Sequence, residues 1–306
     1  MKISIIGAGN VGALSAMRIA HYNLGDIFLV DIAKGLAQGK SLDLADAQAV
    51  LGLDYNIQGS EDISSIKDSA IVVITAGLAR KPGMTREQLL AQNSQILKEV
   101  CVNIREFAPQ SVVIVVTNPL DLMTYLALKT TGFARNKVLG MGSSLDSSRL
   151  ANLIAQELKL PATSVETMVI GTHGEGMLPL ARHTKIKEVS LEEFLNDEQM
   201  EGLTKRTTGR GAEIVALLGS GSAFFAPSAA VAQMVKIIAK DEKKITGACA
   251  YLDGEYGIKD ICLGVPCRLG RAGIEKIIEL DLADKEKKEL LHSADAMRDL
   301  LKQLPV

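Results

Sequence analysis

The chain has 306 residues, of which 47% are apolar and 23% are charged, and its formal net charge is -2. This length suits two packed domains with a sizeable core, and the even charge balance excludes the basic surface that nucleic-acid binding requires. No run of about 18 uninterrupted apolar residues occurs, so we expect no transmembrane helix and no membrane partner.

The start of the chain and its cysteines predict the cellular compartment. The apolar run Ile3–Ile6 directly follows Met1-Lys2, so we expect no signal peptide ahead of the fold. The cysteines form no C-x-x-C pair and have no histidine at metal-ligand spacing. We therefore expect no metal site, and reduced, mostly buried thiols in a cytoplasmic protein.

The first half alternates short apolar runs with longer amphipathic stretches, a pattern typical of parallel βαβ units. Runs such as Ile-Val-Val-Ile lack polar alternation, which indicates strands buried on both faces. We predict strands at Lys2–Ile6, Ile27–Val30, Tyr55–Gln58, Ala70–Thr75, Ser111–Thr117 and Val138–Leu139, and helices at Val11–Tyr22, Lys40–Ala49, Thr85–Phe107 and Leu120–Thr130.

Between the first strand and the first helix lies a G-x-G-x-x-G motif. Its glycines permit a tight turn, a close approach of the backbone to a pyrophosphate, and close packing of helix on strand. Asp31 ends the second strand, where a carboxylate accepts hydrogen bonds from the ribose hydroxyls of NAD and repels the 2′-phosphate of NADP. The sequence therefore predicts an NAD site that includes Asp31 and the motif residues Gly7, Ala8, Gly9, Asn10, Val11 and Gly12.

A second glycine-rich stretch, Gly35 to Ser41, resembles a phosphate loop but has three residues between its glycines instead of four. We interpret it as a loop and the start of a helix.

Two arginines bracket a Pro-Gly hinge in the segment Arg80-Lys81-Pro82-Gly83-Met84-Thr85-Arg86, which follows a buried strand. An arginine presents a planar fork of donors that matches a carboxylate. A mobile loop with two such forks predicts capture of a small substrate with more than one negative charge. Asn93, on the following helix, is interpreted from the sequence alone as a solvated helix residue.

Thr117-Asn118-Pro119 ends the strand Ser111–Thr117. The carboxyl ends of parallel strands line the ligand crevice of an open α/β sheet. Asn118 is therefore a candidate to bind a substrate oxygen or the nicotinamide side of the cofactor, although Asn-Pro is also a common turn.

His173 follows an apolar run and is flanked by glycines in Gly171-Thr172-His173-Gly174. Histidine has an unperturbed pKa near neutrality, as a general acid–base group requires. The alternative is a turn histidine without a role. The other histidines, which are His21, His183 and His292, lie in ordinary helical or polar contexts and are interpreted as structural.

Asp146 and Arg149 open the first helix of the second half and are neighbours on one helical face. They form either an ordinary ion pair at a helix start or two parts of a site. In a site, Asp146 would orient His173 and stabilise its imidazolium form, and Arg149 would bind a substrate carboxylate with both nitrogens.

After about residue 143 the pattern becomes a mixed α+β one. It contains a helix at Asp146–Leu158, an apolar run at Val165–Ile170, a polar stretch at Lys185–Val189, a long helix with small residues and a charged helix at Asp284–Gln303. The predicted fold class is α/β, with a Rossmann doubly wound parallel sheet as the NAD-binding domain (1–143) and a mixed α+β substrate or catalytic domain (144–306).

In their joint order these motifs resemble the NAD-dependent lactate/malate dehydrogenase family, and within it the lactate-dehydrogenase-like malate dehydrogenases. The resemblance runs essentially end to end, from the glycine motif to Gly264-Val265-Pro266. It implies reversible oxidation of (S)-malate to oxaloacetate with NAD, in a homotetramer or homodimer. A place in the tricarboxylic acid cycle goes with that reaction.

The resemblance implies a role for each candidate residue. His173 would accept the proton, with Asp146 as its partner, and Arg149 would hold the carboxylate next to the reacting carbon. Arg86 would polarise the carbonyl oxygen, and Arg80 would bind the second carboxylate, where lactate-specific relatives carry an uncharged residue. The resemblance also assigns cofactor contacts to Asn93, Val116, Thr117 and Asn118, and a substrate contact to Asn118.

The chain departs from the family pattern at Glu175-Gly176 and at Gly142-Ser143-Ser144, which affects pocket shape and rate rather than the reaction. The alternative function is a lactate or other 2-hydroxyacid dehydrogenase. An NAD-dependent glycosidase would need a Cys and His metal site that is missing here, and a non-catalytic NAD sensor would have no need of His173 with its charged partners.

Overall fold

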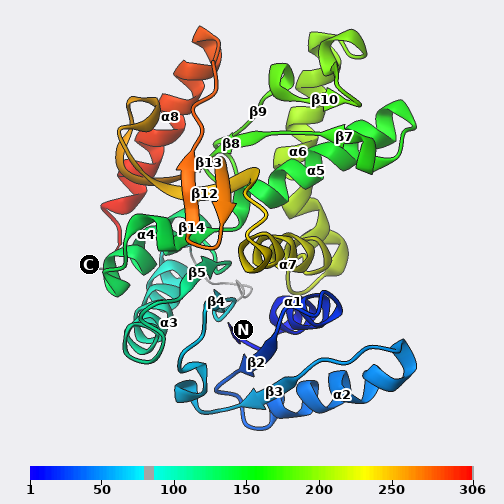
Figure 1. Cartoon of the computed structure of the whole chain (residues 1–306). Coiled ribbons are helices and arrows are strands. Elements are labelled where there is room, and N and C mark those ends of the chain that lie inside the picture. Colours follow the sequence, from blue (N-terminus) through cyan, green and yellow to red (C-terminus); the bar gives the residue numbers. More distant parts are fainter. Residues whose placement is uncertain (79–85, 305–306) are drawn as a thin grey trace.

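The computed structural model describes residues 1–78 and 86–304, except for the side chain of Arg86. In Figure 1 most of the second half of the chain lies above the first half. The strands are β1 (Lys2–Ile6), β2 (Asp26–Val30), β3 (Ile57–Ser60), β4 (Ile71–Ile74), β5 (Val112–Val115), β6 (Val138–Gly140), β7 (Val165–Glu166), β8 (Val169–Gly171), β9 (Met177–Pro179), β10 (Lys185–Ile186), β11 (Val189–Ser190), β12 (Lys244–Asp253), β13 (Lys259–Gly270) and β14 (Gly273–Ile277).

The helices lie mainly between and after these strands. They are α1 (Asn10–His21), α2 (Leu36–Leu51), α3 (Arg86–Phe107), α4 (Leu120–Thr131), α5 (Gly142–Leu158), α6 (Asp197–Leu218), α7 (Phe225–Lys240) and α8 (Asp284–Leu301). Short 3₁₀ turns cover Ile63–Ile66, Arg135–Lys137, Ala162–Ser164, Ala181–His183, Leu191–Glu193 and Glu255–Gly257.

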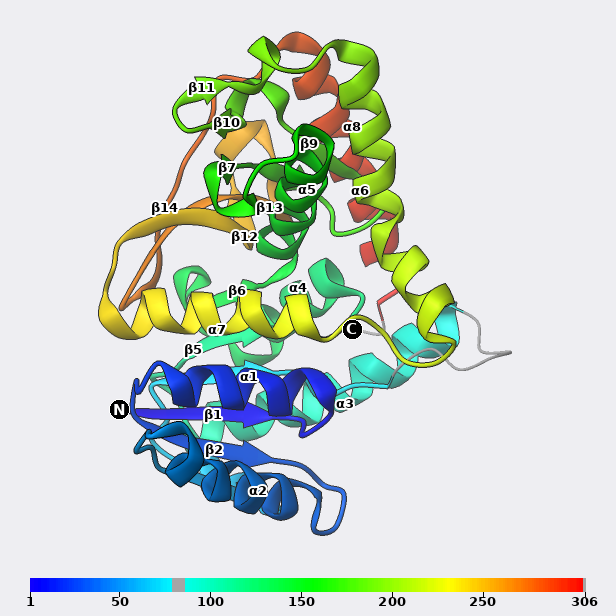
Figure 2. The same cartoon turned by 90° about the vertical axis from the view of Figure 1, so that its right-hand side faces the viewer.

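Six parallel strands of the first half lie in the order β3-β2-β1-β4-β5-β6. This is the strand order of a doubly wound dinucleotide-binding sheet. Helices α1, α2 and α7 cover one face, and α3 and α4 cover the other (Figures 1 and 2). The central strands β4 and β5 are buried along their whole length, as their unbroken apolar runs predict. The predicted α/β fold class is confirmed.

The sheet does not stop at the end of the first half. Strand β12 pairs with β6 at Cys249 and Gly140, and β12 and β13 form a long antiparallel pair that continues to β8 and β9. Eleven strands of the described residues therefore belong to one sheet. A shared sheet ties the second half to the first through backbone hydrogen bonds. The predicted boundary between residues 143 and 144 falls inside α5 and stays a prediction.

Several predicted bounds were wrong. The predicted strand at 55–58 lies two residues later, because Ile57 pairs with Ile27, while Tyr55 donates its hydroxyl to Leu44 of α2. The apolar run 165–170 is two strands, β7 and β8, in separate sheets. The single long helix is in fact two, α6 and α7, because Gly219 ends α6 with φ +70°.

The described residues contain neither a helix that could span a membrane nor a cluster of metal ligands. No helix among residues 1–78 and 86–304 is long and apolar enough to cross a membrane. Within the same residues, no group of three or more His, Cys, Asp or Glu side chains could hold a metal ion.

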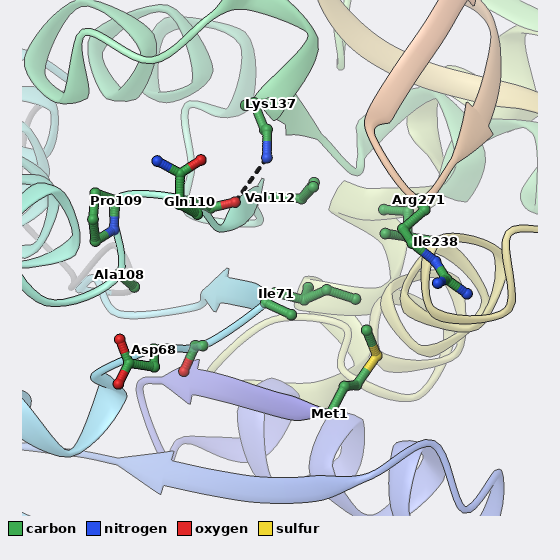
Figure 3. A pocket seen from close by; sticks show the side chains of 12 residues that line it. Met1, Asp68, Ile71, Ala108, Pro109, Gln110, Val112, Lys137, Ile238 and Arg271 are labelled. Atoms are coloured by element: carbon green, nitrogen blue, oxygen red, sulfur yellow. Dashed lines mark hydrogen bonds between the residues drawn. The ribbon is translucent and has the colours of Figure 1, made fainter.

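Cavities lie at both edges of the parallel sheet. A cavity of about 470 Å³ at the amino ends of β1, β4 and β5 is shown in Figure 3, where Lys137 donates to the Gln110 carbonyl oxygen at 2.7 Å. At the carboxyl ends a larger cavity of about 1200 Å³ is lined by Asn118, Asp121 and His173, together with residues of α3 and α8. Ligands of open α/β sheets bind at the carboxyl ends of the strands, so the larger cavity is the candidate site.

Candidate active site

The glycine motif joins β1 to α1, as predicted. Gly7 has φ +105°, which disfavours any residue with a side chain. A Cβ atom at Gly12 would lie 1.9 Å from the Gly7 carbonyl oxygen, so only glycine lets the helix pack this closely. At Gly9, by contrast, a Cβ atom would meet nothing within 4 Å. The turn is therefore tightly packed at Gly12 and leaves free space next to Gly9.

This open side fits a dinucleotide. Gly9 caps α1 without a side-chain hydrogen bond, so the first-turn N–H groups of Asn10 and Val11 remain available to phosphate oxygens. Asp31 follows β2 directly and accepts hydrogen bonds from the N–H groups of Ala8 (2.6 Å) and Ala33 (2.9 Å). These bonds orient the carboxylate beside the turn and leave lone pairs for ribose hydroxyls.

The second glycine-rich stretch is not a phosphate loop. Gly35 has φ +72° and precedes α2, as the interpretation of a loop and helix start predicts. Lys40 donates from Nζ to the Ala8 carbonyl oxygen at 2.7 Å. The lysine of this stretch therefore supports the first glycine turn.

The ends of β4 and β5 are tied together by side chains. Thr117 donates to the carbonyl oxygen of Ala76 at 2.6 Å. Asn93 is 1% exposed, so the interpretation of a solvated residue was wrong. Its Oδ1 accepts the Leu78 N–H at 2.8 Å, and its Nδ2 donates to the carbonyl oxygens of Asn118 (2.8 Å) and Leu78 (3.3 Å).

These bonds use both amide donors of Asn93. Asn93 therefore fixes the turn that carries Asn118. A contact between Asn93 and the cofactor stays a prediction. Val116 is buried beside that turn and Asn118 is exposed at the sheet edge, while their contacts with cofactor and substrate stay predictions.

His173, in the turn after β8, pairs with Asp146 of α5. The Nδ1 atom of His173 lies 2.7 Å from Oδ2 of Asp146, and the side chains are 16% and 2% exposed. Burial by itself lowers the pKa of His173, but the charges of Asp146 and Asp121 and the hydrogen bond to Asp146 outweigh it and raise the pKa. The tautomer with a proton on Nδ1 leaves Nε2 as the free acceptor.

Arg149 lies on the same helical face as Asp146, as its spacing predicts. Its Nη1 donates to Oδ1 of Asp146 at 3.3 Å. Burial lowers the pKa of this guanidinium, which the charge of Asp146 opposes. Its buried Nε has no partner in the described part of the chain. A buried guanidinium with an unused donor suits a carboxylate ligand.

Helix α5 begins at Gly142, four residues before the predicted start, and this explains one departure from the family pattern. A Cβ atom at Gly142 would lie 2.9 Å from Cβ of His173, so glycine at this position allows α5 to pack closely against the histidine. Ser143 is 4% exposed and donates to the Val169 carbonyl oxygen at the start of β8. Together the two residues join the helix of Asp146 to the strand that leads to His173.

The structure describes less of the two arginines of the predicted loop, Arg80 and Arg86, than of Arg149. Arg80 lies outside the described residues. Arg86 is the first residue of α3, whose next residues Glu87, Leu89 and Leu90 line the large cavity. The start of α3 therefore faces the same cavity as His173.

One residue at this site was not singled out by the sequence. Asp121, in the first turn of α4, accepts the backbone N–H of His173 at 2.7 Å. The only sequence signal for it was its place just after Asn118-Pro119, at a strand end.

Two family models match almost the whole chain. The model described as lactate/malate dehydrogenase, NAD binding domain, matches residues 1–140, and the model described as lactate/malate dehydrogenase, alpha/beta C-terminal domain, matches residues 143–304.

Individual relatives agree. A malate dehydrogenase of Methanosarcina barkeri is 50% identical over 305 residues, covering 100% of this chain and 99% of the relative. The solved malate dehydrogenase of Salinibacter ruber is 41% identical with a TM-score of 0.95, over 99% of this chain and 97% of the other. A Cryptosporidium parvum lactate dehydrogenase, complexed with lactic acid and NAD, is 36% identical with a TM-score of 0.95, over 99% and 97%. The chain belongs to the lactate/malate dehydrogenase family.

Proposed function

We propose that this chain catalyses the reversible oxidation of (S)-malate to oxaloacetate with NAD. Full-length relatives between 45% and 50% identical bear the name malate dehydrogenase. The observation that carries the proposal is the His173–Asp146 pair at 2.7 Å beside Arg149, with His173 lining the large cavity. This set supplies a proton acceptor and a carboxylate anchor, which are the groups that a 2-hydroxyacid needs.

We assign the acid–base role to His173. When bound, NAD supplies the acceptor for the hydride that leaves C2 of malate. In that direction Nε2 of His173 takes the proton of the C2 hydroxyl as the C–O single bond becomes a carbonyl. Asp146 holds the ring through Nδ1 and stabilises the imidazolium that forms. In oxaloacetate reduction the same nitrogen returns the proton to the forming hydroxyl.

The arginines divide the anionic groups among them. Arg149 holds the carboxylate next to the reacting carbon with its paired donors. Arg86 stabilises charge that develops on the carbonyl oxygen. Arg80 holds the second carboxylate and so selects a dicarboxylate. Asn118 adds a hydrogen bond at the carbonyl, and Asp31 with the 7–12 turn holds the cofactor.

The rival function is a lactate or other 2-hydroxyacid dehydrogenase, since a lactate dehydrogenase is also among the structural neighbours. An NADH-oxidation assay of the purified chain with oxaloacetate and with pyruvate separates the two. We expect a clear preference for oxaloacetate and for NADH over NADPH. A preference for pyruvate would make the chain a lactate dehydrogenase instead.

Arg80→Gln tests the basis of that preference. Breaking a desolvated ion pair costs about 3 kcal/mol, so we expect the ratio of kcat/KM for oxaloacetate to that for pyruvate to fall roughly 100-fold. Arg182→Gln is the matched control, because Arg182 lies on the surface with a side chain 44% exposed. An unchanged ratio in Arg80→Gln would refute the assignment.

We further propose a homotetramer or homodimer that works in the cytoplasm as part of the tricarboxylic acid cycle. Exposed apolar side chains gather at the end of α6 and the start of α7, including Leu217 (81% exposed) and Phe225 (64%), and such patches favour protein contacts. The four free thiols favour a reducing compartment. Light scattering checks the assembly and cell fractionation the location; a monomer, or enrichment outside the cytoplasm, would contradict this proposal.

A further inference from the structure

Asp121 is a buried carboxylate that the mechanism above does not use. It lies in the first turn of α4, three residues after Asn118, and is 5% exposed. Its Oδ2 accepts the backbone N–H of His173 at 2.7 Å. It therefore joins the turn at the end of β5 to the turn that carries the acid–base histidine, which lies 52 residues further along the chain.

The surroundings of Asp121 make its charge costly. Leu120, Cys249 and Cys262 form a small apolar cluster around the start of α4. Burial raises the pKa of the Asp121 carboxyl, and the nearby Cys249 thiol and His173 lower it in part. Oδ1 of Asp121 has no hydrogen-bond partner in the described part of the chain.

A neutral acceptor would serve the His173 N–H at less cost. Serine or asparagine could accept the same hydrogen bond without placing a charge among apolar side chains, and buried charges are expensive unless they are used. The presence of a carboxylate at position 121 therefore suggests that its negative charge has a function. The nearest group that gains a charge during the proposed reaction is the ring of His173.

Three charged groups act directly on the ring of His173. Asp146 and Arg149 reach it from α5, and Asp121 reaches it from α4. With the ring protonated, two negative and two positive groups cancel. With the ring neutral, one negative charge is in excess. Other ionisable residues line the same cavity on α3, α8 and the histidine turn, which are Glu87, Glu175, Lys288, Glu289 and His292.

The main chain around His173 is held from several sides. Ser293 of α8 accepts the Thr172 N–H at 3.1 Å and donates to the Gly176 carbonyl oxygen at 2.9 Å. Asp121 holds the N–H of His173 itself. The position of the His173 backbone therefore depends more directly on the Asp121 hydrogen bond than on the hydrogen bonds of Ser293, which hold the neighbouring residues Thr172 and Gly176.

We propose that Asp121 is a positioning residue for His173, which anchors the histidine main chain and adds a second negative charge that favours the protonated ring. The inference rests on the proposed function for its consequence in catalysis. Its physical content, a charge acting on His173, holds for the free protein and can be measured without turnover.

The test is an NMR titration of the free full-length chain, following the Cε1–H signal of His173. The four histidines are distinguished by comparison with His173→Gln. Asp121→Asn keeps an acceptor for the His173 N–H and removes the charge. We expect the titration midpoint of the His173 ring to fall by about 1 pH unit in Asp121→Asn. Asp46→Asn, an exposed residue of α2, is the matched control and should leave the midpoint unchanged.

The pH profile of kcat/KM for malate oxidation should shift in the same direction, with its acid limb at lower pH in Asp121→Asn. Asp121→Glu keeps the charge but moves the acceptor, so it should retain the midpoint and lose kcat. If the chain lacks malate activity, the proposed function fails while the titration still tests Asp121.

A folded Asp121→Asn with an unchanged His173 midpoint would overturn the proposal and leave Asp121 as a structural anchor. If Asp121→Asn does not fold, Asp121→Ser is the second neutral variant and carries the same expectation. Failure of both neutral variants to fold, with Asp121→Glu folded, also counts against the proposal, because the carboxylate would then serve stability alone.

Discussion

At the scale of the residue, His173 contacts one carboxylate through its ring and another through its backbone N–H, and it lines the large cavity. Asp146 holds Nδ1, so the ring presents Nε2 to the cavity. A histidine alone could be a turn residue. Its hydrogen bond to a carboxylate that is itself 2% exposed supports the acid–base interpretation over the turn one.

The raised pKa of His173 predicts opposite pH profiles for the two directions. Below that pKa, which lies above the ordinary 6.5, the ring is protonated and cannot accept the malate proton. We expect kcat/KM for malate oxidation to fall about tenfold per pH unit on the acid side, and kcat/KM for oxaloacetate reduction to fall on the alkaline side. Steady-state assays at constant ionic strength measure both, and an acid limb for malate oxidation centred below pH 6.5 would contradict the prediction.

At the scale of the element, the turn between β1 and α1 shows two kinds of glycine. Gly12 packs against Gly7, whereas Gly9 faces open space. The motif predicts close packing at Gly12 and close approach of a ligand at Gly9. The structure separates a packing role from a ligand-facing role.

Alanine at each glycine should separate these roles. Gly12→Ala places a methyl group against a carbonyl oxygen, so we expect a loss of about 1–3 kcal/mol in unfolding free energy and weaker NAD binding. Gly9→Ala should cost less than about 1 kcal/mol yet still weaken NAD binding, since its methyl group lies where the cofactor approaches. Urea unfolding and titration of NADH fluorescence measure the two effects. Equal stability losses in both variants would contradict this assignment.

At the scale of the whole molecule, the cysteines lie in the interior, two in the main core and two in the small cluster with Leu120. All four are free and buried. Burial raises the pKa of the Cys101 thiol to about 12 and also raises the pKa values of Cys249 and Cys267. Thiolates rather than thiols react with electrophiles, so the folded molecule should protect these groups from reaction.

We expect the native chain to release almost no colour with a disulfide thiol reagent over minutes, and to react at four sites in guanidinium chloride. The denatured sample serves as the control for the total. A full equivalent that reacts rapidly under native conditions would show that at least one thiol is accessible.

The sequence predicted the first half better than the second for a physical reason. Parallel strands such as 71–74 are buried on both faces and stand out as unbroken apolar runs. In the second half, strands as short as Val165–Glu166 carry no period of their own, and the pairing of Cys249 with Gly140 joins residues far apart in the chain. Such pairing depends on the assembled fold.

The sequence by itself determined the strand–helix order of the first half, the glycine turn, Asp31 after β2 and the spacing of Asp146 and Arg149, because each is a local property of the backbone or of one helix face. Only the tertiary structure decided that Asp146 meets His173, that Asn93 is buried under the Asn118 turn and that Asp121 holds the histidine main chain. Those contacts join separate elements, and their distances follow from how the sheet and helices pack rather than from spacing along the chain.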